Sequence, residues 1–232
     1  MPRTLLSWSS GKDSAWTLHL LRQQSQYELA GLLTTFNRAA NRVAMHGVRR
    51  ELVQAQARAA SLPLWDVDLP SPCSNGDYER IMREVCAKAV REGIACIAFG
   101  DLFLRDVRAY REKQLEGSGL QPIFPVWDLP TPALARQMID GGLRARLTCI
   151  DTEALFDAFA GREFDHRLLA DLPASVDPCG ENGEFHSCVY AGPMFEHALA
   201  IEAGEIVHRD RFVFADLKLV PNANKSTTSL SS

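Results

Sequence analysis

The first half of the sequence alternates short apolar segments of strand length with segments that have the pattern of helices. Apolar runs at 4–8, 28–35, 64–67 and 94–99 are separated by helical segments that begin near Ser14, at 51–60 and at 77–91. The run from Ile94 to Phe99 is apolar throughout, which is typical of a strand buried on both faces. Strands that alternate with helices at this spacing predict an α/β fold with a doubly wound, mostly parallel sheet.

A polar turn follows the first predicted strand, where a parallel sheet of this kind places its ligands. The turn reads Ser9-Ser10-Gly11-Lys12-Asp13-Ser14. Its small residues allow backbone N–H groups to close in on an anion, and Ser14 can cap the helix that follows. A helix N-terminus carries free N–H groups and partial positive charge, and Lys12 adds a mobile positive charge. The turn therefore predicts a phosphate-binding loop; the alternative is an ordinary strand-to-helix turn with solvated polar residues.

The residues of this turn exclude two common types of phosphate-binding loop. A Walker A loop needs Gly, four residues and then Gly-Lys-Ser/Thr, but Leu6 stands at the first Gly position and Asp13 follows the lysine. The Gly-x-Gly-x-x-Gly pattern of dinucleotide binders is also absent. The turn resembles the PP-loop, the Ser-Gly-Gly-x-Asp-Ser turn of enzymes that cleave ATP between its α and β phosphates. Ser10 replaces the first Gly of the pair, and because serine is small we expect the turn to survive.

Length, charge and cysteine usage narrow the class of protein. The 232 residues suffice for one large domain or a domain and a half, and the net charge of −4 gives no general affinity for nucleic acid. The sequence has no 18-residue apolar run, so we expect no membrane span. Met1-Pro2-Arg3 leads directly into the first strand, so we expect no signal peptide. The six cysteines form no Cys-x-x-Cys pair, which fits a cytoplasmic location.

Two further segments follow predicted strands and are expected to line the same cleft. The segment 36–50 is basic and contains no acid, so it either attracts phosphate or forms a solvated loop; in it, Gly47 permits close approach beside His46. In the segment 100–111, Gly100 leaves space for a nucleotide base or ribose. Asp101 is placed either to bind a metal or ribose hydroxyl or to cap the next helix. The arginines of the two segments are Arg38, Arg42, Arg49, Arg50, Arg105, Arg108 and Arg111, and one or two of the last three are candidates to reach phosphate or substrate.

The second half has a different pattern, and we predict a boundary at Glu116-Gly117. The predicted units are a nucleotide-binding domain at 1–116, a smaller α+β substrate lobe at 117–221 that extends the sheet, and a disordered Ser/Thr-rich tail at 222–232. Within the lobe we expect helices at 131–140 and 154–159 and a strand at 144–150. Further strands at 197–202, 205–211 and 212–220 are expected to be antiparallel, with a turn at Ala203-Gly204.

A second polar segment carries residues suited to chemistry. Asp177-Pro178-Cys179-Gly180-Glu181-Asn182-Gly183-Glu184-Phe185-His186-Ser187 places two carboxylates on a glycine-rich turn, with a histidine two residues later. Glu181 and Glu184 could bind magnesium or orient an amine nucleophile. The alternative is a polar turn that precedes a strand.

The phosphate loop together with Gly180-Glu181-Asn182-Gly183-Glu184-Phe185-His186 resembles the diphthine–ammonia ligase family of PP-loop ATPases, in its short prokaryotic form. That family pairs Ser-Gly-Gly-Lys-Asp-Ser near its start with Gly-Glu-x-Gly-Glu-Phe late in the chain. Met45-His46-Gly47, Gly100-Asp101 and Val126-Trp127-Asp128 also stand where such proteins have motifs. The resemblance covers about Thr4 to Phe195 and implies an adenine nucleotide α-hydrolase-like fold.

The resemblance also implies a reaction and its cofactors, ATP and Mg²⁺. A carboxylate, on protein-bound diphthine or on an unidentified metabolite, would be adenylated with release of pyrophosphate, and ammonia would then displace AMP to form an amide. Nucleotide would be bound by Ser9, Ser10, Gly11, Lys12, Asp13, Ser14, His46, Gly100 and Asp101.

Roles in the chemistry follow from the same resemblance. Lys12 would offset the charge of pyrophosphate, and Asp13 with Glu184 would place the metal. Glu181 and Glu184 would position the acyl substrate or ammonia, with His186 a candidate for proton transfer. A homodimer is compatible with this assignment.

Three other functions are weighed against this one. A PP-loop enzyme that modifies tRNA would be expected to show catalytic cysteines or a basic surface, and the sequence offers neither clearly. An adenosine nucleotide hydrolase needs the same loop. A non-catalytic ATP-binding sensor would bind ATP without magnesium-dependent turnover, and the turn with two carboxylates would be unnecessary for it.

Overall fold

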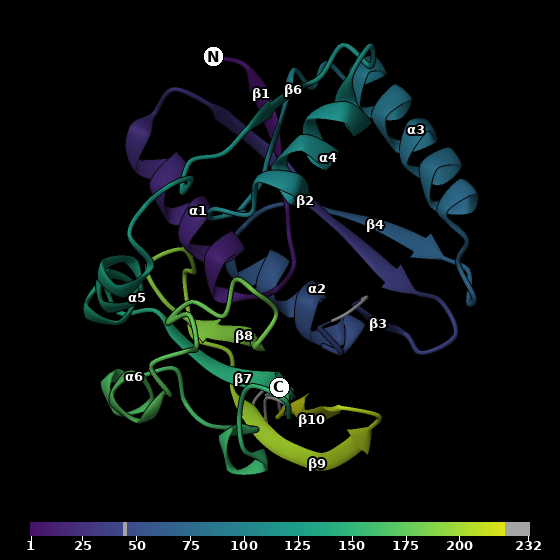
Figure 1. Ribbon diagram of the computed structural model, residues 1–232. Coiled ribbons are helices and arrows are strands. Elements are labelled where there is room, and N and C mark those ends of the chain that lie inside the picture. The colour runs from purple at the N-terminus through teal and green to yellow at the C-terminus, as the bar shows by residue number, and fades with distance from the viewer. Residues whose placement is uncertain (44–45, 221–232) are drawn as a thin grey trace, which may run out of the picture.

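The protein folds into two lobes, each built on its own β-sheet, in a computed structural model that describes residues 1–43 and 46–220 (Figure 1). The first lobe contains, in chain order, β1 (Arg3–Ser7), α1 (Lys12–Gln24), β2 (Glu28–Asn37), β3 (Arg42–Val43), α2 (Arg50–Ala59), β4 (Leu64–Leu69), α3 (Asn75–Arg91), β5 (Cys96–Ala98), α4 (Arg105–Leu115) and β6 (Gln121–Ile123). The second contains α5 (Thr131–Asp140), β7 (Arg144–Asp151), the 3₁₀ helix η1 (Asp157–Phe159), α6 (His166–Asp171), β8 (Phe185–Ala191), β9 (Ile201–Arg209) and β10 (Phe212–Leu219).

The first sheet is mostly parallel, as predicted. β1 lies between β2 and β5 and is parallel to both, β4 adds to the far side of β2, and β6 adds to the far side of β5. The short strand β3 is antiparallel to the end of β2. The chain therefore adds β2 and β4 on one side of β1 and then β5 and β6 on the other side. The point between the carboxyl ends of β1 and β5 is where sheets of this type bind their ligands.

Helices cover both faces of this sheet, because alternate residues of each strand point to opposite faces. Leu6 and Leu32 pack in one core with α1 and α2, whereas Leu5 and Leu33 pack in a second core with α3 and α4. The doubly wound α/β fold is thus confirmed. No helix among residues 1–43 and 46–220 combines the length and the apolar character needed to cross a bilayer.

The second lobe has a separate sheet and does not extend the first, so that part of the prediction is wrong. Its strands are antiparallel in the order β8-β7-β10-β9, and it packs below α1 and α2 (Figure 1). Both predicted lobes are rich in strands, and sequence periodicity does not say which strands pair. β6 lies past the predicted boundary at 116 yet pairs with β5. The division into 1–116 and 117–221 stays a prediction, and the predicted tail at 222–232 lies outside the described residues.

Two local predictions in the second lobe are also wrong. The expected turn at Ala203-Gly204 is instead the middle of the continuous strand β9. Gly204 is small because the side chain of Asp216 lies over it: a Cβ at residue 204 would come within 2.7 Å of Asp216 Oδ2. The expected helix at 154–159 is reduced to the three residues of η1.

Candidate active site

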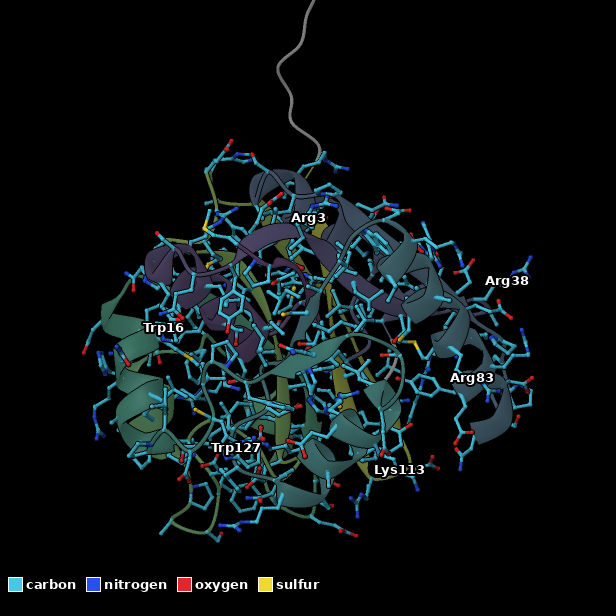
Figure 2. All side chains as sticks on the ribbon, turned by 90° about the horizontal axis from the view of Figure 1, so that it is seen from above. Arg3, Trp16, Arg38, Arg83, Lys113 and Trp127 are labelled. Carbon is cyan, nitrogen blue, oxygen red and sulfur yellow. The ribbon has the colours of Figure 1, made fainter. Side chains whose placement is uncertain are left out.

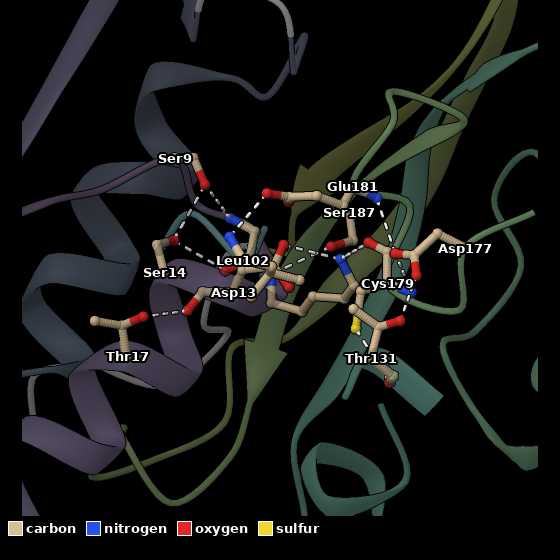
Figure 3. A network of polar contacts seen from close by, with 12 residues as sticks. Ser9, Asp13, Ser14, Thr17, Leu102, Thr131, Asp177, Cys179, Glu181 and Ser187 are labelled. Carbon is tan, nitrogen blue, oxygen red and sulfur yellow. Dashed lines mark hydrogen bonds and ion pairs between the residues drawn. The ribbon is translucent and has the colours of Figure 1, made fainter. Parts of the chain in front are cut away.

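Polar contacts join the predicted phosphate loop to the glycine-rich turn of the second lobe (Figure 3). Both segments line a cavity of about 370 Å³. The cavity lies beyond the carboxyl ends of β1 and β5. Most of the residues that line it are either charged or small. They are Ser7, Ser9, Gly11, Lys12, Asp13, Ser14, His46, Phe99, Gly100, Asp101, Leu104, Val107, Arg111, Cys179, Gly180, Glu181, Phe185, His186 and Ser187. Of the predicted site residues, the structure brings all but Ser10 and Glu184 to this lining.

The phosphate loop is held by its own side chains. Ser9 Oγ accepts from Gly11 N at 3.3 Å and lies 3.1 Å from Ser14 Oγ, which donates to the Gly11 carbonyl at 3.0 Å. Ser14 therefore braces the loop and does not cap α1; Gly11 is the N-cap residue, and no side chain caps it. Among the described residues, no carbonyl accepts from the N–H groups of Asp13 and Ser14. They are the donors that a helix N-terminus offers to an anion.

Ser10 has an unusual backbone conformation for a residue other than glycine. Its φ is 72°, in the left-handed region that favours glycine, and its side chain is fully buried. The Ser10 carbonyl accepts from Val189 N at 3.0 Å and from Gln56 Nε2 at 3.1 Å. Hydrogen bonds from α2 and β8 thus hold the backbone of Ser10 in this conformation.

Gln56 supplies one of those bonds, and sequence reasoning did not single it out. It is fully buried; its Oε1 accepts from Trp8 Nε1 at 2.9 Å, and its Nε2 also donates to the Val189 carbonyl at 2.6 Å. It thereby joins the end of β1, the phosphate loop and β8. A signal was present in the sequence, because Gln56 is a polar residue on the apolar face that Leu52 and Val53 define on α2.

Lys12 is not the mobile charge that the sequence suggested. Only 2% of the residue is exposed, and its Nζ donates to Asp13 Oδ2 at 2.9 Å and to the Cys179 carbonyl. The ammonium also lies 5.7 Å and 5.3 Å from the ring centres of Phe164 and Phe185. Burial by itself lowers the pKa of Lys12, but the Asp13 carboxylate, Cys179 and Glu181 together outweigh it, so the pKa is raised and Lys12 stays charged. It is a fixed cation that ties the loop to the second lobe.

Asp13 keeps one oxygen available for a ligand. Its Oδ2 is paired with Lys12, whereas Oδ1 is buried and has no hydrogen-bond partner among the described residues. Burial raises the pKa of Asp13, and the Lys12 ammonium opposes that shift. An unpartnered buried carboxylate oxygen beside a phosphate loop is the kind of ligand that Mg²⁺ uses together with phosphate oxygens.

The two glutamates of the glycine-rich turn have different positions. Glu184 is 7% exposed; it accepts from Asp177 N at 2.9 Å, from Asn182 N at 2.9 Å and from Asn182 Nδ2 at 3.0 Å. Its carboxylate closes the turn and is not part of the cavity lining, so the structure does not bring it to Asp13 as a shared metal ligand. Asp177 completes the turn by accepting from Cys179 N and Glu181 N at 3.0 and 3.1 Å.

Glu181 reaches into the cavity from the same turn. Its Oε1 accepts from Leu102 N at 2.8 Å and from Phe103 N at 3.4 Å, so it bridges the second lobe to the segment after β5. Burial raises the pKa of Glu181 to about 7; the bond from Leu102 opposes that shift and the charge of Asp13 adds to it. A carboxyl group with this pKa can take up or release a proton near neutral pH.

Two histidines lie together at the cavity wall. The rings of His46 and His186 have centres 4.4 Å apart, and Nδ1 of His46 has no partner among the described residues. Burial lowers the pKa of His186 to about 4, with a further contribution from Lys12. Burial, and then the charges of His186 and Lys12, lower the pKa of His46 well below its usual value. Both rings are therefore neutral at pH 7. Met45, part of the predicted His46 motif, lies outside the described residues.

Gly100 lines the cavity and also packs closely against α1. A Cβ at residue 100 would lie 2.9 Å from Ser14 N and 3.1 Å from the Asp13 carbonyl, so the glycine is needed where β5 ends against the first turn of α1. Asp101 does not cap α4, whose N-cap residue is Leu104; its Oδ2 lies 3.5 Å from Arg111 Nε. Burial raises the pKa of Asp101, and Arg111 opposes that shift.

The basic segment 36–50 does not present its arginines to the cavity. Arg42 and Arg49 both bind Asp216 of β10, with closest distances of 2.8 and 2.7 Å, and Arg50 binds Asp66 at 2.6 Å. Arg38 projects from the edge of the molecule, as Figure 2 shows. Three of the four arginines thus serve as structural ion pairs, and those with Asp216 join the two lobes beside His46.

A second cavity of about 410 Å³ adjoins the first. It shares Ser7, Ser9, His46, Phe99 and Arg111 with the first cavity and continues between β2, α3 and α4. Its other lining residues are uncharged: Trp8, Leu33, Thr35, Val43, Leu69, Cys73, Ser74, Asn75, Tyr78, Met82, Cys86, Ile97, Gln114 and Leu115. Within the described ranges, no group of three or more His, Cys, Asp and Glu side chains is arranged to hold a metal ion on its own.

Residues 131–220 match the family model of the diphthamide synthase C-terminal domain. The predicted resemblance is confirmed over these residues. They include the turn that carries Glu181 and the strand that carries Asp216, whereas the phosphate loop lies outside the match. No curated protein matches the chain.

Two solved structures have a similar arrangement of the chain. One is a predicted subunit of a tRNA methyltransferase from Methanocaldococcus jannaschii, at 12% identity and a TM-score of 0.44, with 83% of this chain and 98% of that chain covered. The other is the U34-tRNA thiolase NcsA from Methanococcus maripaludis with its 4Fe-4S cluster, at 16% identity and a TM-score of 0.37. This match covers 60% of this chain and 57% of the thiolase chain.

Proposed function

We propose that this protein is an ATP-dependent ligase that adenylates a carboxylate and then forms an amide with ammonia, releasing AMP and pyrophosphate. The observation that carries the proposal is the pairing across one cavity of the phosphate loop with Glu181 of a diphthamide synthase-like lobe. The loop supplies anion recognition, and Glu181 supplies a carboxyl group able to exchange a proton near neutral pH. Neither feature alone accounts for both halves of the reaction.

The two cavities suit the two ends of ATP. The cavity between β2, α3 and α4 is uncharged apart from the shared Arg111, which favours the neutral base and ribose. The cavity at the loop carries the fixed Lys12 ammonium and the free N–H groups of Asp13 and Ser14, which favour the β and γ phosphates. ATP would then lie across the end of β1.

The free Oδ1 of Asp13 fits a magnesium ion that is held mainly by phosphate oxygens. Such an ion, when bound, neutralises charge on the phosphates. Glu184 contributes to this only by shaping the turn, because its two oxygens already accept hydrogen bonds within it.

The proposed reaction has two displacements. A carboxylate oxygen of the substrate attacks the α phosphorus, the bond to the bridging oxygen of the β phosphate breaks, and pyrophosphate leaves. Ammonia then attacks the acyl carbon, the bond to the AMP oxygen breaks, and the nitrogen loses a proton. Glu181, whose pKa lies near 7, would position ammonium and take up the proton that must leave before attack. His186 lines the same cavity as a neutral acceptor. The acyl group is protein-bound diphthine or another carboxylate.

Product analysis tests the proposal. The purified protein is incubated with magnesium-ATP, with and without ammonium, and AMP, ADP, pyrophosphate and phosphate are separated by chromatography. We expect AMP and pyrophosphate, formed slowly without an acyl acceptor, and exchange of labelled pyrophosphate into ATP when the acceptor is supplied. ADP and phosphate as products would contradict adenylation.

A variant pair ties the products to this site. Asp13→Asn should abolish AMP formation by the folded protein. Asp106→Asn is the matched control, because Asp106 also lies in the first turn of a helix but is exposed. Wild-type turnover in Asp13→Asn would count against the assignment.

A further inference from the structure

Arg111 occupies a distinctive place between the two cavities. It is one of five residues that line both, and among those five it alone carries a permanent charge, since His46 is neutral at pH 7. Beyond Arg111 on one side the lining is uncharged. On the other side it contains Lys12, Asp13 and Glu181. In a ligand that spans both cavities, the uncharged part would therefore lie on one side of Arg111 and the charged part would start beside it.

The guanidinium of Arg111 is held in place, but it keeps hydrogen-bond donors that have no good acceptor among the described residues. It lies 5.1 Å from the ring centre of Phe99, in cation–π contact, and Nε is 3.5 Å from Asp101 Oδ2. That distance is too long for a good hydrogen bond, and Nε has no other partner among the described residues. The side chain of Arg111 is 27% exposed and that of Asp101 is 18% exposed. A partly desolvated guanidinium with open donors is suited to bind a phosphate with two parallel bonds.

The neighbouring arginine on α4 shows that this placement is specific. Arg108 lies one turn before Arg111, but it donates to Glu112 at 2.8 Å and lies over the rings of Phe124 and Trp127. It lines neither cavity. Of these two arginines, the fold directs one to the cleft and the other to the surface.

We propose that Arg111 binds the α-phosphate of the nucleotide and that Asp101 positions the Arg111 guanidinium against Phe99. This assignment rests on the proposed function for the orientation of ATP. It places Arg111 where negative charge grows as pyrophosphate leaves, and it makes Asp101 a positioning residue that touches the ligand only through Arg111.

Binding of three fragments of ATP tests this by calorimetry: adenosine, AMP and pyrophosphate. Arg111→Met should weaken AMP binding by about 10- to 100-fold, since hydrogen bonds to charged groups are involved. Binding of adenosine and pyrophosphate should stay within about twofold of the wild type, because neither contains the α-phosphate. Arg108→Met is the matched control and should leave all three affinities unchanged. Arg111→Lys should recover only part of the AMP affinity, because an ammonium cannot make two parallel bonds.

The double variant Arg111→Met/Asp101→Asn separates direct contact from repulsion by an uncompensated Asp101. AMP affinity should remain low in it; recovery to the wild-type value would overturn the proposal. The proposal also fails if Arg111→Met weakens pyrophosphate and not AMP, if it weakens adenosine as much as AMP, or if the wild type binds AMP no better than adenosine. These fragments need no turnover. A wild type that discriminates AMP through Arg111 but forms ADP and phosphate would refute the proposed function alone.

Discussion

Replacement of Gln56 by leucine would remove the amide that joins the phosphate loop to its surroundings while it keeps most of the side-chain volume. Gln56 is fully buried and accepts one bond from Trp8 and donates to the Val189 and Ser10 carbonyls. The Ser10 carbonyl would keep its bond from Val189 N. The Trp8 indole N–H would lose its acceptor, and the Val189 carbonyl would lose its side-chain donor.

The size of the effect follows from these two groups. A buried polar group left without a partner costs about 1–3 kcal/mol, so two of them cost about 2–6 kcal/mol. The new leucine offsets part of this loss, because burial of a leucine side chain contributes roughly 1.5–3 kcal/mol. We therefore expect Gln56→Leu to lower the free energy of unfolding by about 1–3 kcal/mol.

Urea denaturation, followed by tryptophan fluorescence, measures this difference. Gln54→Leu is the matched control, because Gln54 lies on the exposed face of the same helix, and we expect a change within about 0.5 kcal/mol there. Gln56→Glu should give an intermediate loss, since a protonated carboxyl keeps one acceptor and one donor. We also expect the Gln56→Leu variant to bind pyrophosphate more weakly, because Ser10 loses one of the two bonds that hold its left-handed backbone.

The reasoning would be refuted by an unfolding free energy of Gln56→Leu that equals that of Gln54→Leu. It would then follow that the three bonds of Gln56 contribute no more than an apolar side chain in their place. A large loss of stability with unchanged pyrophosphate affinity in the folded fraction would refute the link to the phosphate loop only.

Three further predictions concern other parts of the site. Burial raises the pKa of Glu181 in the folded protein to about 7, so its contribution to stability is lost as pH rises from 4.5 to 7. Over that range the melting temperature of Glu181→Gln should therefore rise relative to that of the wild type. Parallel pH profiles of the two melting temperatures would contradict this. Asp216→Asn should cost about 1–3 kcal/mol in urea denaturation through loss of its two arginine partners, and the cost should shrink in high salt; a loss independent of salt would point to another cause. Gly100→Ala should lower the free energy of unfolding by about 1–3 kcal/mol and impair ATP binding, because its Cβ would lie 2.9 Å from Ser14 N. The control Gly76→Ala in α3 should be neutral or stabilising. Equal stability of the two variants would show that α1 moves freely.

Most of the first lobe could be predicted because its signals are local. A strand buried on both faces is apolar throughout, as at 94–99, and an amphipathic helix repeats its apolar residues with helical spacing, as at 77–91. The second lobe was harder, because Gly204 resembles a turn residue in sequence and is instead placed opposite the side chain of Asp216.

The site could be predicted in outline for a similar reason. The loop Ser9–Ser14 and the segment after β5 follow strands, and parallel strands place their carboxyl ends at one edge. The positions of individual charges could not be predicted, because they depend on partners far away in the chain. Lys12 donates to the carbonyl of residue 179, and Arg49 binds Asp216, 167 residues away.

The glutamates of the glycine-rich turn show the limit most clearly. Glu181 and Glu184 are chemically alike and three residues apart, and by sequence either could have faced the cavity. Asp177 and Asn182 donate to Glu184 and draw it into the turn, whereas Leu102 of the other lobe donates to Glu181 and draws it into the cavity. The sequence by itself determined the strand, turn and helix that make a phosphate loop, because backbone conformation follows from local residue types. Only the tertiary structure decided which charges line the cavity, because a carboxylate or an arginine binds the buried partner that the packing of distant segments brings within reach.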